Sequence, residues 1–295
     1  INADDPIAAS LGDAASRGVV WFGVDSGRES GISASDGTAD IRHCPQCHGT
    51  LEYTLRLMGH LGTYHCPGCG RKRPEPDWTA RDLRSSGMTR QEFRLVHRDG
   101  RSFVVTPGFP GMHAVYNSLA ALATLDALNM LDTGAVQWLA EFRPPYGRYE
   151  EIPLDGRTIL LMLVKNPAGA NASLDILSRH AADLSVLILL NDLAADGRDI
   201  SWIYDASFEA IASAQSIVTG GRRAQAMALR MLHSGADPGR IQAVSGEAGA
   251  ALDVALEKTG PGGVLALIAT YTAMHAVRAV LVRRAGIREF WKDGT

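Results

Sequence analysis

The most informative stretch of the chain spans residues 144–171, which read PPYGRYEEIPLDGRTILLMLVKNPAGAN. Its apolar run at 158–164 is short and lacks helical spacing, so it predicts a buried strand. Lys165, Asn166 and a Gly-containing turn follow at once, and a helix is expected to begin near Asn171. The carboxyl end of a strand in an open parallel sheet is where ligands bind, and a helix N-terminus there offers N–H groups to an anion. From spacing alone, an ordinary turn with a solvated lysine explains the pattern equally well.

After this stretch the chain repeats one pattern, in which short apolar runs alternate with segments of helical spacing. The apolar runs predict strands at 184–190, 216–218, 241–244 and 264–269. The spacing predicts helices near 171–182, 206–214, 222–234, 246–258 and 272–285. Such βα alternation is typical of a parallel sheet covered by helices and joined by right-handed crossovers. Polar loops would then meet at one edge of the sheet and form a ligand site, at 165–169, 191–201, 219–223, 245–247 and 270–272.

Composition places the chain among ordinary globular proteins. It has 295 residues, of which 46% are hydrophobic and 21% charged, enough to bury the cores of two domains. The net charge of −3 provides no basic field, so a nucleic-acid partner is not expected. The chain contains no apolar run of about 18 residues and no basic-then-apolar leader, which predicts a soluble cytoplasmic protein without a membrane span. It begins at Ile1 and not at Met, which suggests that a preceding segment is left out.

All four cysteines of the chain fall in two C-x2-C pairs, Cys44 with Cys47 and Cys66 with Cys69. This spacing is typical of structural zinc sites, because each CPxC turn brings two thiolates and its own backbone N–H groups to one side. We therefore expect one tetrahedral zinc site in a ribbon over about 41–74. Such a site keeps no open coordination position, so the ribbon is a scaffold or contact surface and does no hydrolysis.

Two disulfides or free thiols are the alternatives to zinc at these cysteines. A short hairpin is expected at 50–63, between the two pairs, and it is not typical of a secreted, disulfide-stapled fold. Reduced thiolates that bind zinc also fit a cytoplasmic location. His43, His48 and His65 lie beside the cysteines and are expected to be neighbours of the site and not ligands.

The rest of the first half is less regular. Val19–Val24 predicts a buried strand, and the Ser/Gly/Asp-rich residues 26–40 are expected to form a loop. Alternating patterns at 93–96 and 103–106, around Asp99-Gly100, predict a β-hairpin. The first half thus predicts strands around the ribbon without the βα repeat of the second half.

Residues 112–131 place Ala, Leu and Asn at helical spacing and predict a helix with one apolar face. Asn117 would lie near the N-terminal end of this helix. Its amide could contact a ligand there, although a solvated helix residue is the simpler interpretation.

The connection at 191–205, which reads NDLAADGRDISWIYD, is unusually long and charged. It holds four carboxylates, one arginine and the aromatic residues Trp202 and Tyr204. Most of these residues fit a solvated loop. Two aromatic side chains on a βα connection, however, favour a surface for a partner or a substrate.

Several motifs together give the chain a resemblance to the MurT family, the Mur-ligase-like subunits of lipid II isoglutaminyl synthase. They are NADDP at 2–6, the four-cysteine ribbon at 44–69, G-x5-N-x2-AA at 111–121, YGRYE at 146–150, VKNPAGAN at 164–171, DGRDISWIYD at 196–205 and TYTAM at 270–274. The resemblance covers nearly the whole chain. It implies an α/β fold: the C-terminal part of a Mur ligase central domain with an inserted zinc ribbon over 1–143, and a Rossmann-like C-terminal α/β domain over 144–295.

The resemblance also implies a reaction in peptidoglycan synthesis. MurT works with GatD, a glutamine amidotransferase that releases ammonia from glutamine, and converts the D-glutamate of the lipid II stem peptide to D-isoglutamine. ATP and Mg²⁺ activate the glutamate α-carboxylate, because a carboxylate does not react with ammonia until phosphorylation supplies a leaving group. The substrate would bring the subunit to the inner face of the membrane.

Individual residues receive roles from the same resemblance. Lys165 would stabilise charge that develops on the phosphoryl group. The cofactor-binding residues would be Asn2, Asp4, Asp5, Asn117, Arg148 in the interdomain hinge, and Asn166. No G-x4-G-K-[ST] motif occurs in the chain, so the phosphate-binding loop is expected in a preceding segment, and the fragment alone is expected to be inactive.

The partner's active site would also need a residue from this chain. A glutaminase of this class uses a Cys nucleophile and a His base, and a carboxylate normally orients that His. The resemblance implies that MurT supplies this carboxylate. Asp205 is preferred because it follows the aromatic pair and could be held at the start of the next helix, whereas Asp199 lies in a Gly-containing turn. A simple helix-capping role for Asp205 is the alternative.

Two other functions remain possible at this point. A Mur or folylpolyglutamate-type ligase that joins an amino acid directly would share the nucleotide domain but is expected to lack the ribbon. A non-enzymatic zinc-ribbon interaction module is the third possibility, and the net charge of −3 disfavours it as a nucleic-acid binder. Co-purification with a glutaminase would distinguish the three.

Overall fold

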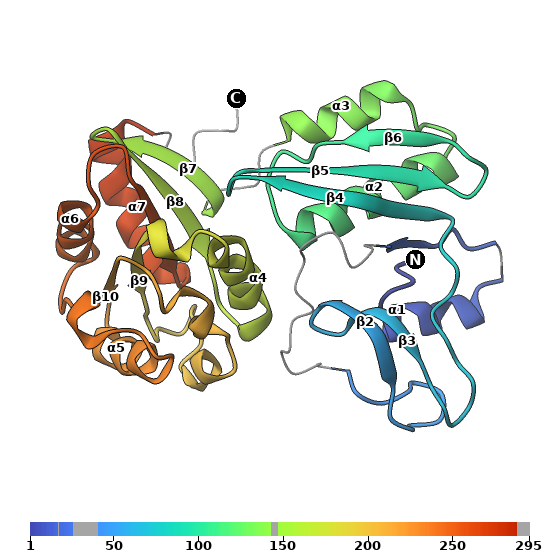
Figure 1. Cartoon of the computed structure of the whole chain (residues 1–295), viewed down its shortest axis with the longest axis horizontal. Helices are drawn as coiled ribbons and strands as arrows, with labels where there is room; N and C mark the ends of the chain where they lie inside the picture. Colours follow the sequence, from blue (N-terminus) through green and yellow to red (C-terminus); the bar gives the residue numbers. More distant parts are fainter. Residues whose placement is uncertain (17, 26–40, 143–146, 288–295) are drawn as a thin grey trace. The chain divides into compact units, whose positions relative to one another are not determined.

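A computed structural model describes residues 1–16, 18–25, 41–142 and 147–287 of the chain. The chain divides into two compact units, Ile1–Arg143 and Pro144–Thr295 (Figure 1). The loop expected at 26–40 lies outside the described residues, as do the first three residues of the stretch at 144–171.

The first unit contains a sheet in the order β1-β4-β5-β6. Its strands are β1 (Phe22–Val24), β4 (Trp78–Ser86), β5 (Arg90–His97) and β6 (Ser102–Val105). β1 pairs in parallel with β4, and the other pairs are antiparallel, so the hairpin predicted around Asp99-Gly100 is confirmed. No sequence pattern indicated the central strand β4. It carries charged residues and an irregular register between Arg81 and Arg84, which breaks the alternation that reveals a strand.

Helix α2 (Met112–Ala127) packs on this sheet and is followed by α3 (Thr133–Glu141). The core between helix and sheet holds Trp78, Phe93, Leu95, Val115, Leu119 and Leu122. The predicted helix at 112–131 is correct in type but ends early. Leu128 leaves the helical conformation and Asn129 adopts a left-handed backbone with φ of 57°, which ends the helix there.

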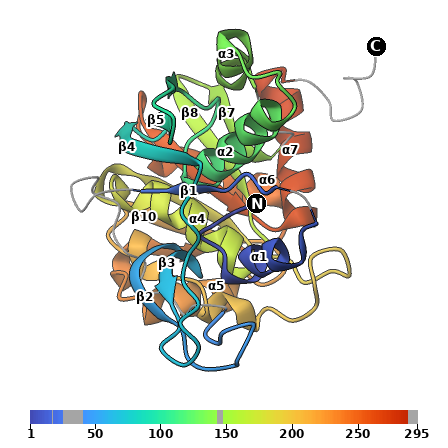
Figure 2. The same cartoon turned by 90° about the vertical axis from the view of Figure 1, so that its right-hand side faces the viewer.

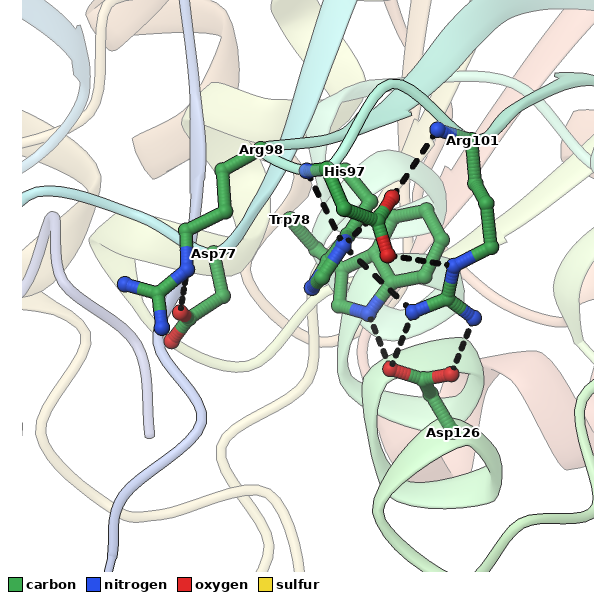
Figure 3. A network of polar contacts seen from close by, with 7 residues as sticks. Asp77, Trp78, His97, Arg98, Arg101 and Asp126 are labelled. Atoms are coloured by element: carbon green, nitrogen blue, oxygen red, sulfur yellow. Dashed lines mark hydrogen bonds and ion pairs between the residues drawn. The ribbon is translucent and has the colours of Figure 1, made fainter.

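A polar network fastens the end of α2 to the β5–β6 turn (Figure 3). Asp126 of α2 accepts hydrogen bonds from Nε1 of Trp78 at 3.0 Å and from Nη1 of Arg101 at 2.6 Å. The Arg101 guanidinium lies over the Trp78 ring and also donates to Asp99, which is paired with His97. The bond from Arg101 lowers the pKa of Asp126, and the backbone N–H of Arg101 lowers the pKa of Asp99.

The inserted ribbon of the first unit contains the antiparallel hairpin β2 (Glu52–Met58) and β3 (Leu61–His65). The hairpin expected at 50–63 is therefore confirmed. Short helix α1 (Pro6–Leu11) lies beside this hairpin, where the backbone N–H of Gly62 donates to the carbonyl of Asp4 at 3.0 Å (Figure 2). The N-terminal segment and the ribbon thus support each other.

The second unit is built on a six-stranded sheet in the order β11-β10-β9-β12-β8-β7. The strands are β7 (Arg148–Leu154), β8 (Arg157–Leu163), β9 (Ser185–Leu189), β10 (Ser216–Gly220), β11 (Ile241–Ala243) and β12 (Val264–Ala269). The five strands predicted from apolar runs are all present and parallel. The predicted parallel sheet is thus confirmed for these strands, and β7, which was not predicted, joins β8 as an antiparallel edge strand.

The turn between β7 and β8 explains that antiparallel edge. Asp155 and Gly156 have φ values of 50° and 71°, the two positive angles of a tight hairpin turn. Asp-Gly between apolar runs is a strong hairpin signal, so the sequence did carry the information.

Helices α4 (Pro167–Ser178), α5 (Ala224–His233), α6 (Ala248–Lys258) and α7 (Tyr271–Ala285) cover the sheet (Figure 1). Ile159 and Leu161 of β8 pack into the core that contains α6 and α7. Leu160 and Met162 alternate with them along the strand and are buried on the opposite face. A sheet covered on both faces is what continuous apolar strands predict. The helix predicted at 206–214 is wrong, since that segment forms only the 3₁₀ turn η5 (Phe208–Ile211).

Candidate functional site

The carboxyl ends of β8, β12 and β9 lie side by side in the second unit. Ala269 at the end of β12 is in register with Leu163 of β8 and with Leu189 of β9. The residues that follow these three strands, Lys165, Thr270 and Asn191, are therefore brought to one edge of the sheet. Strand ends gathered in this way are where open α/β sheets bind ligands.

Lys165 and Asn166 occupy the tip of β8 and are both exposed. Asn166 is the N-cap of α4, because its Oδ1 accepts from the backbone N–H of Gly169 at 2.8 Å, and Pro167 opens the helix. Among the described residues, no hydrogen bond or ion pair engages the Lys165 ammonium. A cation beside a helix N-terminus is suited to hold a negatively charged group.

A second cluster at this edge contains Asp196, which no motif assigned to a role. Its carboxylate accepts from the backbone N–H of Thr272 at 2.7 Å, from Oγ1 of Thr272 at 2.6 Å and from the backbone N–H of Leu193 at 3.1 Å. Asn191 donates from Nδ2 to Oγ1 of Thr272 at 2.9 Å. Asp196 is buried, and its bonds to Thr272 join residues 191–205, which we call the acidic loop, to the first turn of α7. An acid in a Gly-containing loop gives no sequence signal for such a long-range bond.

The acidic loop after Asp196 continues into the 3₁₀ turn η4 (Ser201–Tyr204). Asp199 accepts from the backbone N–H of Ser201 at 2.8 Å, which lowers the pKa of Asp199. Asp205 lies at the C-terminal end of η4, is exposed, and its carboxylate has no hydrogen-bond partner among the described residues. It therefore does not cap a following helix, and η5 begins after Ser207 without a side-chain cap.

The two aromatic residues of the loop differ in exposure. Tyr204 is 55% exposed, whereas Trp202 is half-buried. Tyr204 is thus available at the surface next to Asp205.

Asp4 lies at the centre of a buried polar cluster in the first unit. With no exposed surface, it accepts from the backbone N–H of Val24 at 2.8 Å, from the hydroxyl of Tyr116 at 2.7 Å and from Nε of Arg73 at 2.5 Å. Burial raises the pKa of Asp4, while the charge of Arg73 and the hydrogen bond from Tyr116 oppose the rise. The carboxylate holds the N-terminal segment against β1, α2 and the ribbon.

The other residues with an expected nucleotide role lie at several places. Asn2 accepts from the backbone N–H of Asp4 at 3.0 Å, and Asp5 caps α1 through the N–H groups of its first turn. Asn117 is exposed near the start of α2, and Arg148 is exposed at the first position of β7. The three acidic and amide residues of the N-terminal segment thus each have a hydrogen-bonding role within their own unit.

The four cysteines converge in the ribbon. Their sulfurs all lie within 4.8 Å of one another, with Cys44 3.6 Å from Cys69 and Cys47 3.4 Å from Cys66. The two turns have the same geometry, since the backbone N–H of each first cysteine is bonded to the carbonyl five residues later. No histidine belongs to the cluster among the described residues.

This donor set fits a structural Zn²⁺ ion. Four thiol sulfurs in one compact group are the ligands of a closed tetrahedral site. Burial acts to raise the pKa of the Cys44 thiol, but hydrogen bonds from the backbone N–H groups of Cys47 and Gln46 help to lower it to about 7. A thiol that ionises readily is suited to a metal cation. Backbone hydrogen bonds from Gly49 and Arg71 act to lower the pKa values of the Cys47 and Cys69 thiols, but the neighbouring cysteines help to raise both above the usual value.

Solved structures resemble most of the chain. A pseudomurein peptide ligase type C from Methanothermus fervidus aligns with a TM-score of 0.67 at 22% identity and covers 96% of this chain and 56% of its own. MurC, the UDP-N-acetylmuramate-alanine ligase of Thermotoga maritima, aligns with a TM-score of 0.53 at 16% identity over 71% of this chain and 46% of its own. The chain has a Mur-ligase-like α/β fold.

Sequence comparison finds a matching family model and relatives with known names. Residues 163–274 match the family described as MurT ligase C-terminal. The lipid II isoglutaminyl synthase (glutamine-hydrolyzing) subunit MurT of Streptococcus pneumoniae is 31% identical over 92% of this chain and 59% of its own length. The same subunit of Staphylococcus aureus is 30% identical over 78% of this chain and 51% of its length. The chain is similar to these MurT subunits and spans little more than half of their length.

In the part of the chain that the structure describes, no helix is both long enough and apolar enough to cross a membrane.

Proposed function

We propose that this chain is part of the ligase subunit of a lipid II isoglutaminyl synthase, which amidates the α-carboxylate of D-glutamate in the lipid II stem peptide. The observation that carries the proposal is its 30–31% identity to two curated subunits of that name. Their names include glutamine hydrolysis, which supports a GatD-type glutaminase partner that supplies ammonia. The lipid substrate would bring the complex to the cytoplasmic face of the membrane.

The edge of the second unit's sheet supports a role in the ligase step. ATP with Mg²⁺ would supply the phosphoryl group that activates the carboxylate. Lys165, exposed at the strand tip beside the N-terminus of α4, would stabilise charge that develops on that group, and Asn166 would hold the turn. Arg148 would contribute a second cation from the start of β7.

The N-terminal segment would take part in nucleotide binding in two ways. Asn117, near the start of α2, and Asp5, the N-cap of α1, would contact the nucleotide or its metal ion. Asp4 is fully buried, so it would act by holding Asn2 and the surrounding backbone in place. Cys44, Cys47, Cys66 and Cys69 would bind one structural zinc ion.

The acidic loop supports the partner's chemistry. A carboxylate that enters another protein's Cys–His site must be exposed and not already bonded, and Asp205 meets both conditions while Asp199 is bonded to Ser201. Asp205 would orient the partner's His and stabilise its imidazolium. Tyr204 would contact the partner beside it.

The test is to express the full-length protein with candidate glutaminases and purify the complex. Co-purification of a glutaminase, together with ATP-dependent amidation of a lipid II stem peptide, would support the proposal. A protein that binds no glutaminase and joins a free amino acid to the peptide would instead be a direct Mur-type ligase.

A further inference from the structure

Arg230 of α5 is a buried charged side chain that no sequence motif singled out. It is 4% exposed, and its buried guanidinium donates hydrogen bonds to the backbone at the end of the acidic loop. Nε donates to the carbonyl of Ile203 at 2.8 Å, and Nη2 donates to the carbonyl of Ala206 at 2.8 Å. One guanidinium therefore fixes the backbone on both sides of Asp205.

The remaining contacts of Arg230 belong to the same arrangement. Nη2 also donates to Oε1 of Glu209 at 2.9 Å, and Nη1 donates to Oγ of Ser234 on its own helix. The rings of Tyr204 and Phe208 lie 5.8 and 5.6 Å from the guanidinium carbon. The segment 203–209 thus wraps around a single planar cation, and an arginine with its fixed set of donors suits this role where lysine does not.

A second side chain holds the loop just after Asp205. Oδ1 of Asn171, on α4, accepts from the backbone N–H of Ser207 at 2.7 Å. Two helices that are distant in sequence therefore fix the backbone around Asp205.

Other residues restrain the backbone around Asp205 but not its side chain. The neighbouring carbonyls and N–H group are bonded to α5 and α4, whereas the carboxylate is exposed and unbonded among the described residues. Burying a guanidinium is unfavourable unless its donors are paired, and here two of the hydrogen-bond partners are backbone carbonyls of a surface loop. A carboxylate that must meet a partner's imidazole benefits from such a fixed position, because a small misplacement lowers a reaction rate strongly.

We propose that Arg230 and Asn171 are positioning residues that set the place of Asp205 for the partner's active site. The inference rests on the proposed function, in which Asp205 completes the glutaminase site. Neither residue touches the partner's substrate, and both act through the backbone at 203–207.

The test uses the full-length protein in complex with its glutaminase. Arg230→Lys keeps the charge but cannot bind both carbonyls in the same geometry, and Asn171→Ala removes the acceptor for Ser207. Each is expected to lower kcat for glutamine hydrolysis roughly 10- to 100-fold while KM for glutamine and the dissociation constant of the complex stay unchanged. Asn171→Asp keeps the acceptor and should restore kcat. Ser234→Ala, which removes a bond of Arg230 outside the loop, is the matched control and should keep wild-type kcat.

Double variants distinguish positioning from a general loss of stability. Because Arg230 acts through Asp205, Arg230→Lys combined with Asp205→Asn should hydrolyse glutamine no more slowly than Asp205→Asn alone. If the losses of kcat in Arg230→Lys and Asp205→Asn multiply in the double variant, the inference is overturned. It is also overturned if Arg230→Lys and Asn171→Ala both keep wild-type kcat while Asp205→Asn is slow. If Asp205→Asn itself keeps wild-type turnover, the proposed role of Asp205 fails instead. Should Arg230→Lys not fold, the Asn171→Ala and Asn171→Asp pair decides alone, and equal kcat in the two would refute the proposal.

Discussion

The cysteine ribbon of the first unit and the acidic loop of the second are both irregular segments that need an external support. In the ribbon, four sulfurs lie within 4.8 Å of one another, and a metal ion bound by them would supply the support. In the loop, the support comes from protein side chains: Asp196 bonds to Thr272, and Arg230 bonds to Ile203 and Ala206. The ribbon should therefore depend on bound metal as well as on its contacts with the N-terminal segment, whereas the loop should depend on distant side chains and not on metal.

The largest effect is expected when the ribbon loses its metal. Removal of zinc with a chelator, or Cys66→Ser, should unfold the ribbon, because an incomplete site binds metal far more weakly. The second unit should keep its own unfolding transition. Metal analysis together with calorimetry checks both parts, and substoichiometric zinc in protein purified without chelator, or a disulfide among the cysteines, would contradict the expectation.

Loss of the Lys165 cation at the edge of the sheet should lower synthase activity and leave glutaminase activity unchanged. In the full-length complex, Lys165→Ala should lower synthase activity by about two to three orders of magnitude, since a fixed cation no longer stabilises the transferring phosphoryl group. Glutaminase activity should survive. Lys258→Ala, which removes an exposed lysine at the C-terminal end of α6, is the matched control. Wild-type synthase rates in Lys165→Ala would show that Lys165 is an ordinary solvated loop residue.

The protein-based support of the loop can be broken at Asp196. Asp196→Asn would place an N–H group opposite the donors of Thr272 and Leu193, and we expect the second unit to lose about 1–3 kcal/mol of unfolding free energy. Chelators should not change this loss. Asp183→Asn, an exposed acid of the same unit, is the control for removal of a charge. Denaturant titration measures the difference, and equal stability of the two variants would show that the bond to α7 contributes nothing.

The smallest effect concerns acid stability of the first unit. Asp126 and Asp99 have pKa values in the folded state below their usual range, so they stabilise the fold above about pH 4 and lose this contribution as the pH falls further. The slope of unfolding free energy against pH should therefore be flatter in Asp126→Asn between about pH 4 and 2. An unchanged slope would mean that the network in Figure 3 does not contribute to acid stability.

The comparison also shows which features were visible in the sequence. The cysteine spacing and the hairpin between the pairs are local patterns, and both are present in the structure. The five parallel strands were also visible from their apolar residues, which form long runs in β8, β9 and β12 and shorter ones in β10 and β11. What the sequence concealed depends on partners far along the chain: the bond from Asp196 spans 76 residues to Thr272, and those from Arg230 span 24 to 27 residues.

Two strands were missed for different reasons. β7 was missed although the sequence Asp155-Gly156 indicates a tight turn. β4 was missed because its irregular register interrupts the alternation of buried and exposed residues. Fully buried Asp4 matched a family motif, but its contacts with Val24, Tyr116 and Arg73 could be seen only in the folded chain. The roles of the candidate site residues remain predictions for the experiments above.

Transfer of labelled nitrogen tests the central claim most directly. The full-length complex would be given lipid II, ATP and glutamine labelled with heavy nitrogen in its side-chain amide, and the product would be analysed by mass spectrometry. We predict that the label appears in the α-amide of D-isoglutamine, and that Lys165→Ala abolishes the labelled product while glutamine is still hydrolysed. A product that lacks the label in this amide would contradict the account.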